Sequence, residues 1–192
     1  MAKPTIVLHS CCATCAAYVL EKLSEEFNPI IFYYNPNIHP KEEYFIRKSE
    51  LLAYAQKKAI PFFEEEYDPQ EWFTTTKGLE NEPEKGTRCN RCFELRLAKT
   101  ASFAVQNKIE VFTTTLTISP HKVSKNIIEI GKKIATKFNI FFWAEDFKKK
   151  DGFKKTMEIA KRENFYRQNY CGCVYSKRIS TENHTIVIPK LQ

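Results

Sequence analysis

Seven cysteines fall into three short motifs of the 192-residue chain. These motifs contain Cys11, Cys12 and Cys15, then Cys89 and Cys92, and finally Cys171 and Cys173. An odd number of cysteines in a chain that begins without a cleavable apolar segment argues against a disulfide framework. Thiolates are the preferred protein ligands of zinc and of iron–sulfur clusters. The pattern therefore predicts a metal centre to which all three motifs contribute.

The number of sulfurs exceeds what one metal site uses. A structural zinc ion takes four ligands, and a 4Fe-4S cluster takes up to four. Seven sulfurs minus four leaves three, which is enough for a second metal with an open position or for a redox-active pair. The neighbouring side chains of Cys11 and Cys12 point in different directions, which also favours two adjacent sites. This arithmetic leaves the individual ligands unassigned.

Alternating apolar strands and amphipathic helices must position these motifs. We expect strands at 5–8, 29–34, 60–63, 111–116 and 140–143, and helices at 13–27, 42–58, 92–106, 127–138 and 153–163. This alternation predicts one α/β domain over 1–192 with a mostly parallel, doubly wound sheet, and with 68–88 as a long loop or lid. Ligands bind such sheets beyond the carboxyl ends of the strands. Two of the cysteine motifs open helices, whose N-termini stabilise thiolates.

Other polar residues are candidates for catalysis or for binding RNA. His9, Cys15 and Asp146 are catalytic candidates, and His9 is equally well explained as a structural histidine. Phosphate contacts are expected from Lys122, Lys148 and Lys149, and base stacking or phosphate contacts from Tyr166 and Arg167. The competing interpretations are an ordinary helix cap near Ser119, a solvated basic loop, and aromatic packing in the core.

Charge is distributed unevenly along the chain. Residues 1–96 carry 12 basic and 15 acidic groups, a net charge of −3, whereas residues 97–192 carry 18 basic and 8 acidic groups, a net charge of +10. A basic half favours a polyanionic partner such as RNA, although a solvated lysine-rich surface would look the same. No apolar run is long enough to span a membrane, so we expect a cytoplasmic protein with no membrane partner.

Five segments of the sequence together resemble the epoxyqueuosine reductases of the QueH type. They are His9-x-Cys11-Cys12-x-x-Cys15, Arg88-Cys89-x-x-Cys92-Phe93, Thr114-Thr115-Leu116-x-x-Ser119-Pro120-His121-Lys122, Asp146-Phe147-Lys148-Lys149 and Arg167-Gln168-Asn169-Tyr170-Cys171-Gly172-Cys173. The match extends from about residue 5 to residue 178, and Thr14 stands where we would expect proline.

The resemblance implies a fold, a cofactor and a reaction. The fold would be like that of the adenine-nucleotide hydrolases, and the cofactor a 4Fe-4S cluster with a neighbouring mononuclear iron or other metal. The reaction would reduce epoxyqueuosine to queuosine at the wobble position of tRNA. No glycine-rich phosphate loop is present among the 5 glycines, so electrons would come from an external donor. Two other classes remain open: a different cluster-dependent tRNA-modifying enzyme, and a zinc-stabilised RNA-binding module.

Overall fold

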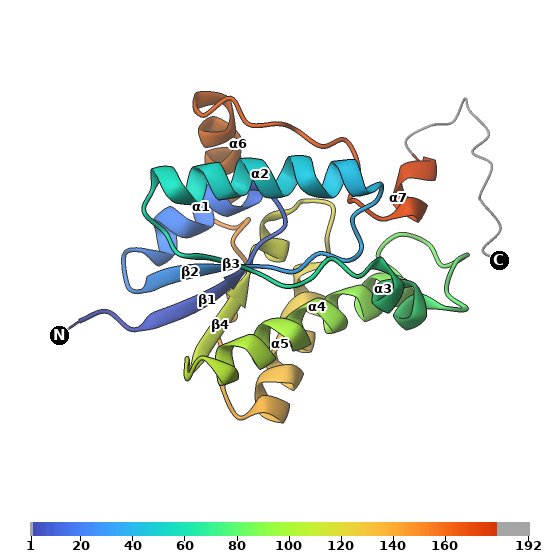
Figure 1. Ribbon diagram of the computed structural model, residues 1–192, viewed down its shortest axis with the longest axis horizontal. Helices are drawn as coiled ribbons and strands as arrows, with labels where there is room; N and C mark the ends of the chain where they lie inside the picture. The colour runs from blue at the N-terminus through green and yellow to red at the C-terminus, as the bar shows by residue number, and fades with distance from the viewer. Residues whose placement is uncertain (1, 180–192) are drawn as a thin grey trace.

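A parallel five-stranded sheet forms the centre of the protein. A computed structural model describes residues 2–179, and its strands lie in the order β3-β2-β1-β4-β5 (Figure 1). Their bounds are β1 (Thr5–His9), β2 (Asn28–Tyr33), β3 (Phe62–Glu64), β4 (Val111–Thr114) and β5 (Phe141–Phe142). Every strand pair is parallel. The predicted fold class, an α/β domain with a doubly wound sheet, is confirmed.

The middle strand β1 is buried on both faces, as its unbroken apolar sequence indicates. Ile6 and Leu8 pack into one core layer, and Val7, which points the other way, packs into the second. His9 ends the strand and is also fully buried. The chain then leaves the carboxyl edge of the sheet at the residues that carry the first cysteine motif.

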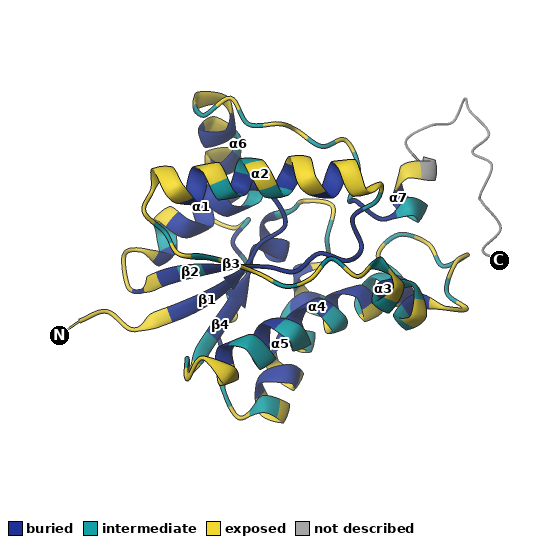
Figure 2. Ribbon diagram, in the orientation of Figure 1, coloured by how far each residue is buried: buried dark blue, intermediate teal, exposed yellow. Residues whose placement is uncertain are grey.

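Helices cover both faces of this sheet (Figure 1). One layer contains α1 (Ala13–Leu23), α2 (Lys41–Lys57) and α6 (Gly152–Arg162), and the other contains α4 (Thr87–Gln106) and α5 (Ser124–Phe138). Figure 2 shows that these helices turn their buried residues to the strands and their exposed residues outward. No helix among residues 2–179 is long and apolar enough to cross a membrane.

The segment 68–88, expected as a long loop or lid, is helical in part. Helix α3 (Pro69–Thr76) begins at Asp68, whose carboxylate accepts a hydrogen bond from the Gln70 backbone N–H at 2.9 Å. A capping Asp followed by Pro at the first helical position is a start signal that the polar composition obscured. Its role as a lid stays a prediction.

Other boundaries also differ from expectation. Helix α4 begins at Thr87 and therefore includes Cys89, whereas we expected its start at residue 92. The expected strand 111–116 ends at Thr114 and continues as the short 3-10 helix η1 (Thr115–Ile118). Helix α7 (Val174–Ile179) directly follows the last cysteine motif.

Close contact between α6 and the loop before it depends on Gly152. A Cβ atom at this position would overlap the Phe147 carbonyl oxygen and come within 2.9 Å of the Tyr18 ring. We therefore expect Gly152→Ala to lower the free energy of unfolding by about 1–3 kcal/mol, because the backbone must shift to relieve the overlap. Urea unfolding measures this change, with Lys154→Ala on the exposed face of α6 as the control. Equal losses in the two variants would contradict the packing argument.

Candidate metal centre

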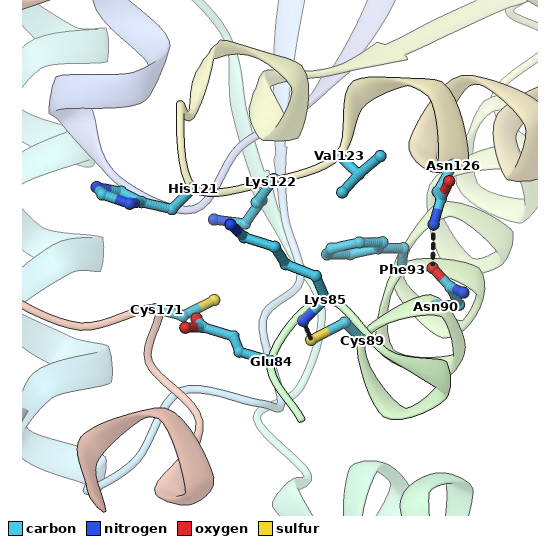
Figure 3. A pocket seen from close by; sticks show the side chains of 10 residues that line it. All are labelled: Glu84, Lys85, Cys89, Asn90, Phe93, His121, Lys122, Val123, Asn126 and Cys171. Carbon is cyan, nitrogen blue, oxygen red and sulfur yellow. Dashed lines mark hydrogen bonds between the residues drawn. The ribbon is translucent and has the colours of Figure 1, made fainter. Parts of the chain in front are cut away.

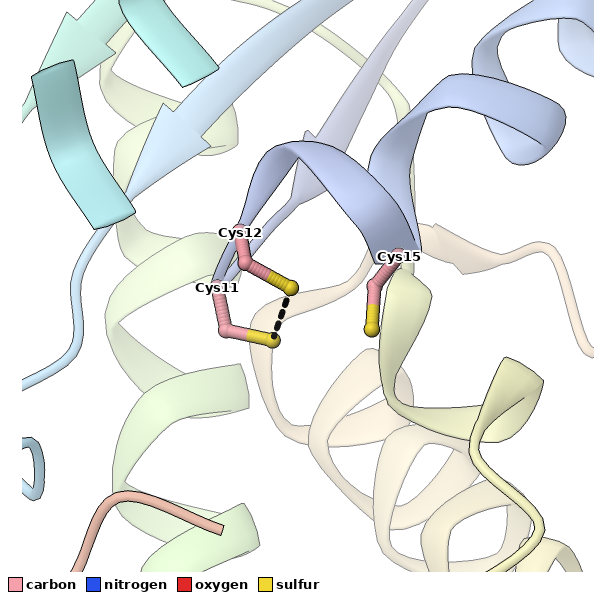
Figure 4. Close-up of side chains that lie close together, drawn as sticks. All are labelled: Cys11, Cys12 and Cys15. Carbon is pink, nitrogen blue, oxygen red and sulfur yellow. Dashed lines mark hydrogen bonds between the residues drawn. The ribbon is translucent and has the colours of Figure 1, made fainter. Parts of the chain in front are cut away.

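The three cysteines of the first motif form one group of sulfurs at the start of α1. Cys12 is the N-cap residue of this helix, and Cys15 lies in its first turn. The Sγ atoms of Cys11, Cys12 and Cys15 all lie within 4.8 Å of one another (Figure 4). We call these three residues the sulfur trio. Within residues 2–179, no other three Cys, His, Asp or Glu ligand atoms form such a potential metal site.

The thiols of the sulfur trio shift one another's pKa values through hydrogen bonds. Hydrogen bonds from Cys12 and then Cys15 hold the pKa of Cys11 well below its usual value. The same hydrogen bonds raise the pKa of Cys15 and raise that of Cys12 to about 12. The Gln168 side-chain N–H also donates to the Cys12 sulfur at 3.2 Å. Cys11 is therefore the member of the trio whose thiolate form is most favoured, and thiolate is the form that binds a metal cation.

The other four cysteines come from two distant segments and form a second group. Cys89 and Cys92 lie in the first turns of α4, and Cys171 and Cys173 precede α7. Cys92 and Cys173 are packed together against the Trp72 ring of α3, while Cys89 and Cys171 line one small hollow (Figure 3). We call these four residues the sulfur quartet.

Gly172 allows the chain to turn between two members of the quartet. Its φ is +121°, a conformation that a residue with a side chain rarely adopts. A Cβ atom there would also meet Ile38 at 3.0 Å and Arg47 at 3.3 Å. Arg47 in turn donates to the Cys171 and Tyr170 carbonyl oxygens at 3.2 and 3.3 Å, which fixes this turn against α2.

Burial favours the protonated form of three quartet thiols, those of Cys89, Cys92 and Cys173. Burial raises the pKa of Cys89 and of Cys173, and raises that of Cys92 to about 11 against the opposing field of Arg96. The fields of Cys171 and Cys173 add to this effect at Cys89 and Cys92. A bound metal would reverse it, because a coordinated thiol loses its proton.

Buried cations surround the sulfurs. The Arg96 side chain is 1% exposed, donates to Asn35 Oδ1 at 2.6 Å, and approaches Cys92 Sγ at 4.0 Å. No carboxylate within residues 2–179 forms an ion pair with it. Burial opposes the charge, but the sulfurs of Cys92, Cys11 and Cys171 outweigh burial and raise the pKa of Arg96. Arg96 therefore links the trio and the quartet electrostatically.

A hollow of about 320 Å³ opens beside the sulfurs. Cys11 and Cys15 of the trio line it together with Cys171 of the quartet. Its other walls come from the turn 118–122, from α6, and from the segment 167–171. Cys171 and Lys122 line both this hollow and the small one of Figure 3. Two sulfurs of the trio and one of the quartet thus line the same cavity.

The predicted catalytic candidates lie in different surroundings. Cys15 lines the larger hollow. His9 lies in the core: its Nδ1 is 2.9 Å from Thr114 Oγ1, and burial lowers its pKa to about 3. Asp146 accepts a hydrogen bond from Ser124 Oγ at 2.9 Å and so joins the loop after β5 to the start of α5. Neither His9 nor Asp146 lines a hollow beside the sulfurs.

Some of the expected RNA-binding residues are exposed, and others contact groups inside the protein. Arg167 and Lys149 are exposed, and Arg167 borders the larger hollow. Tyr166 is 39% exposed, and its hydroxyl donates to Glu43 at 2.9 Å. Lys148 instead donates to the Ser119 and Lys122 carbonyl oxygens at 3.4 and 2.8 Å, and thereby holds the turn between them. Lys122 faces the sulfurs.

Sequence reasoning missed the buried groups behind the sulfurs. Arg96 interrupts the apolar stripe of α4 one turn after Cys92, which is a signal that could have been noticed. Trp72 stood out only as an aromatic residue in a polar segment. Its buried indole N–H lies beside Cys92 and favours the thiolate form of that cysteine.

Together these features define a class: α/β proteins with a thiol-rich centre at the carboxyl edge of a parallel sheet. The epoxyqueuosine reductase QueH family model matches residues 6–179. A QueH epoxyqueuosine reductase of Acinetobacter baylyi is 46% identical over 175 residues, which cover 90% of this chain and 80% of that one. One from Thermotoga maritima is 34% identical over 97% of both chains. The chain belongs to the QueH family of epoxyqueuosine reductases and is an oxidoreductase of tRNA queuosine biosynthesis.

A solved structure supports the fold alone. It is described as a predicted subunit of tRNA methyltransferase from Methanocaldococcus jannaschii, and it superimposes with a TM-score of 0.55. The superposition covers 83% of this chain and 74% of that one at 12% identity. The resemblance inferred from the cysteine motifs is confirmed by the family match, and the α/β fold by this structure.

Arg96 should matter for metal binding more than any exposed arginine nearby. We expect Arg96→Met to weaken Cd²⁺ binding by the apoprotein about tenfold or more, because metal-bound thiolates carry a negative charge that the guanidinium balances. Arg91→Met is the control, since Arg91 is exposed and pairs with Glu94 on the surface. Anaerobic competition titrations measure both affinities. Wild-type affinity in Arg96→Met would show that the sulfurs do not depend on this charge.

Proposed function

We propose that this chain reduces epoxyqueuosine in tRNA to queuosine with an iron–sulfur centre held by its seven cysteines. The observation that carries this proposal is the pair of sulfur groups beside one hollow, the trio at α1 and the quartet at α4 and α7. QueH relatives are named for the reaction on epoxyqueuosine. A zinc-stabilised RNA-binding module would need only four of these sulfurs.

The residues present fit an anionic metal centre. The quartet supplies the four thiolates that a 4Fe-4S cluster takes, and the trio supplies three ligands to a second metal, leaving a position open. Two buried donors point to the same conclusion: the Arg96 Nε–H lies beside the quartet without an acceptor in the described part of the chain, and the Trp72 indole N–H favours the thiolate form of Cys92. Such donors stabilise an anionic group. When bound, the centre would supply electrons one at a time.

The protein itself provides a binding cavity for the modified base. A hollow of about 320 Å³ is large enough for a base extruded from the anticodon loop. Arg167, Asn169 and Tyr170 line it, and these are residue types that stack on bases or hydrogen-bond to their edges. The backbone contacts of Arg47 hold this segment in place beside Cys171. The epoxide would thereby be directed toward the sulfurs.

No nucleotide cofactor is needed to complete this site. The loop after β1, where related folds cradle phosphate, contains Cys11 and Cys12 instead. Electrons would therefore come from an external donor protein or reductant. Since its substrate is tRNA, we place the enzyme in the cytoplasm.

The test is conversion of epoxyqueuosine by the purified protein. Anaerobically prepared protein should contain iron and acid-labile sulfide at about four or more of each per chain. Given a chemical reductant and tRNA from cells that lack their own reductase, it should yield queuosine without ATP or a nicotinamide, as digestion and mass analysis of the tRNA would show. Stoichiometric zinc without sulfide would favour the RNA-binding module. A loaded protein that leaves epoxyqueuosine unchanged would refute the assignment.

Binding of tRNA should depend on salt through the exposed cations only. We expect Lys149→Ala and Arg167→Ala each to reduce the slope of log affinity against log salt by about 0.7–0.9, because each removes one phosphate contact. Lys108→Ala, an exposed lysine in the loop between α4 and β4 at the opposite edge of the sheet, should leave the slope unchanged. Filter binding between 50 and 200 mM salt, on the order of the physiological range, measures the slopes. Identical slopes for all three variants would exclude this edge as the docking face.

A further inference from the structure

Lys122 lies where the two sulfur groups and the two hollows meet. It follows η1 in the turn 119–123 and precedes α5. Its side chain lines the larger hollow with Cys11, Cys15 and Cys171, and the smaller one with Cys89 and Cys171. Figure 3 shows it pointing into the smaller hollow from the same turn as His121. Of the lysines within residues 2–179, only Lys122 lines both hollows.

The charge of Lys122 has no carboxylate partner. No Asp or Glu within the described part of the chain forms an ion pair with its ammonium. Its side chain lines the hollow that Cys11 and Cys15 of the trio share with Cys171 of the quartet. Among the described residues, Lys122 therefore brings a cation without a carboxylate partner to the wall of this hollow.

Hydrogen bonds to the loop after β5 fix the turn that carries Lys122. Lys148 Nζ donates to the backbone oxygen of Lys122 at 2.8 Å and to that of Ser119 at 3.4 Å. At the other end of the turn, Ser124 Oγ donates to Asp146 at 2.9 Å. These contacts fix the backbone of the turn against the loop after β5. Its position is therefore built into the fold, as a preorganised group requires.

A phosphate contact does not suit this position. Cys11, Cys15 and Cys171 line the hollow together with Lys122, and as metal ligands they would be thiolates that repel the full negative charge of a phosphate. An epoxide oxygen, by contrast, is uncharged when it enters and gains negative charge only as its bonds to carbon break. A cation next to that oxygen stabilises the transition state more than the bound substrate, which is the condition for catalysis.

We propose that Lys122 is a catalytic residue whose ammonium donates a hydrogen bond to the epoxide oxygen of the substrate. This inference rests on the function proposed above. In the overall reaction both C–O bonds break, a C=C bond forms, and the oxygen leaves as water. Two electrons come from the external reductant and two protons from solvent. The ammonium is charged before and after the reaction, and Lys148 acts as the positioning residue for its backbone.

The experiment compares Lys122→Met and Lys122→Gln with Lys125→Met, which removes an exposed lysine from the first turn of α5. Single-turnover conversion of epoxyqueuosine tRNA is measured at saturating tRNA and expressed per iron-loaded chain. We expect both Lys122 variants to be slower by about 100-fold or more, the usual loss for one oxyanion donor. Their tRNA affinity and its salt slope should stay within about twofold of wild type, and Lys125→Met should convert at the wild-type rate.

Several results would overturn this role. Wild-type rates in the neutral Lys122 variants would exclude it. Weaker tRNA binding with a salt slope reduced by about one unit and an unchanged rate would make Lys122 a phosphate contact. Loss of iron and sulfide from both neutral variants would make its role structural. If the proposed function itself fails, the wild-type protein will not convert epoxyqueuosine, so the two failures are distinguishable.

Discussion

The candidate metal centre depends on one constraint: the charge of Arg96 is buried and has no carboxylate within residues 2–179 to pair with. Arg96 is surrounded by protein on all sides, and its possible counter-charges are sulfurs. Isolated buried charges are expensive, and the cost falls only when a neighbour supplies the opposite charge. The thiols are neutral when burial governs them and anionic when a metal binds them. The buried charge of Arg96 thus destabilises the metal-free protein and would stabilise the form with metal-bound thiolates.

The parallel sheet explains how sequence-distant sulfurs come together. Right-handed crossovers return every strand in the same direction, so the loops that follow β1, β4 and β5 open at one edge. The first sulfur group follows β1 directly, while the second is brought to the same edge by the start of α4 and by the chain after α6. Arg47 in α2 completes the assembly, because its side chain donates hydrogen bonds to the backbone oxygens of Cys171 and Tyr170. Four segments therefore have to fold before the site exists.

The sequence predicts the scaffold, and the gathering of cysteines from three motifs at one edge of the sheet, better than it predicts the groups around them. Strand and helix periodicity depends on local alternation of apolar residues, and it located the elements within a few residues. Helix α3 was missed because its polar face and short length weaken that signal. The state of His9 depends on Thr114 and Tyr34, which lie far along the chain, and no local pattern reveals such partners. Lys122 and Lys148 look alike in the sequence, and only the tertiary structure shows that one faces sulfur and the other backbone carbonyls.

The distance along the chain between the trio and the quartet has a consequence for how the enzyme is made. Cys11 is synthesised early, whereas Cys173 leaves the ribosome only after the whole sheet has been translated. Under the function proposed above, the quartet cannot hold a metal centre before that moment, so the newly folded protein has free thiols. The raised pKa values of Cys89, Cys92 and Cys173 favour their protonated form during this interval. A protonated thiol is a poor nucleophile and oxidises slowly, so burial protects these three thiols in the newly folded protein.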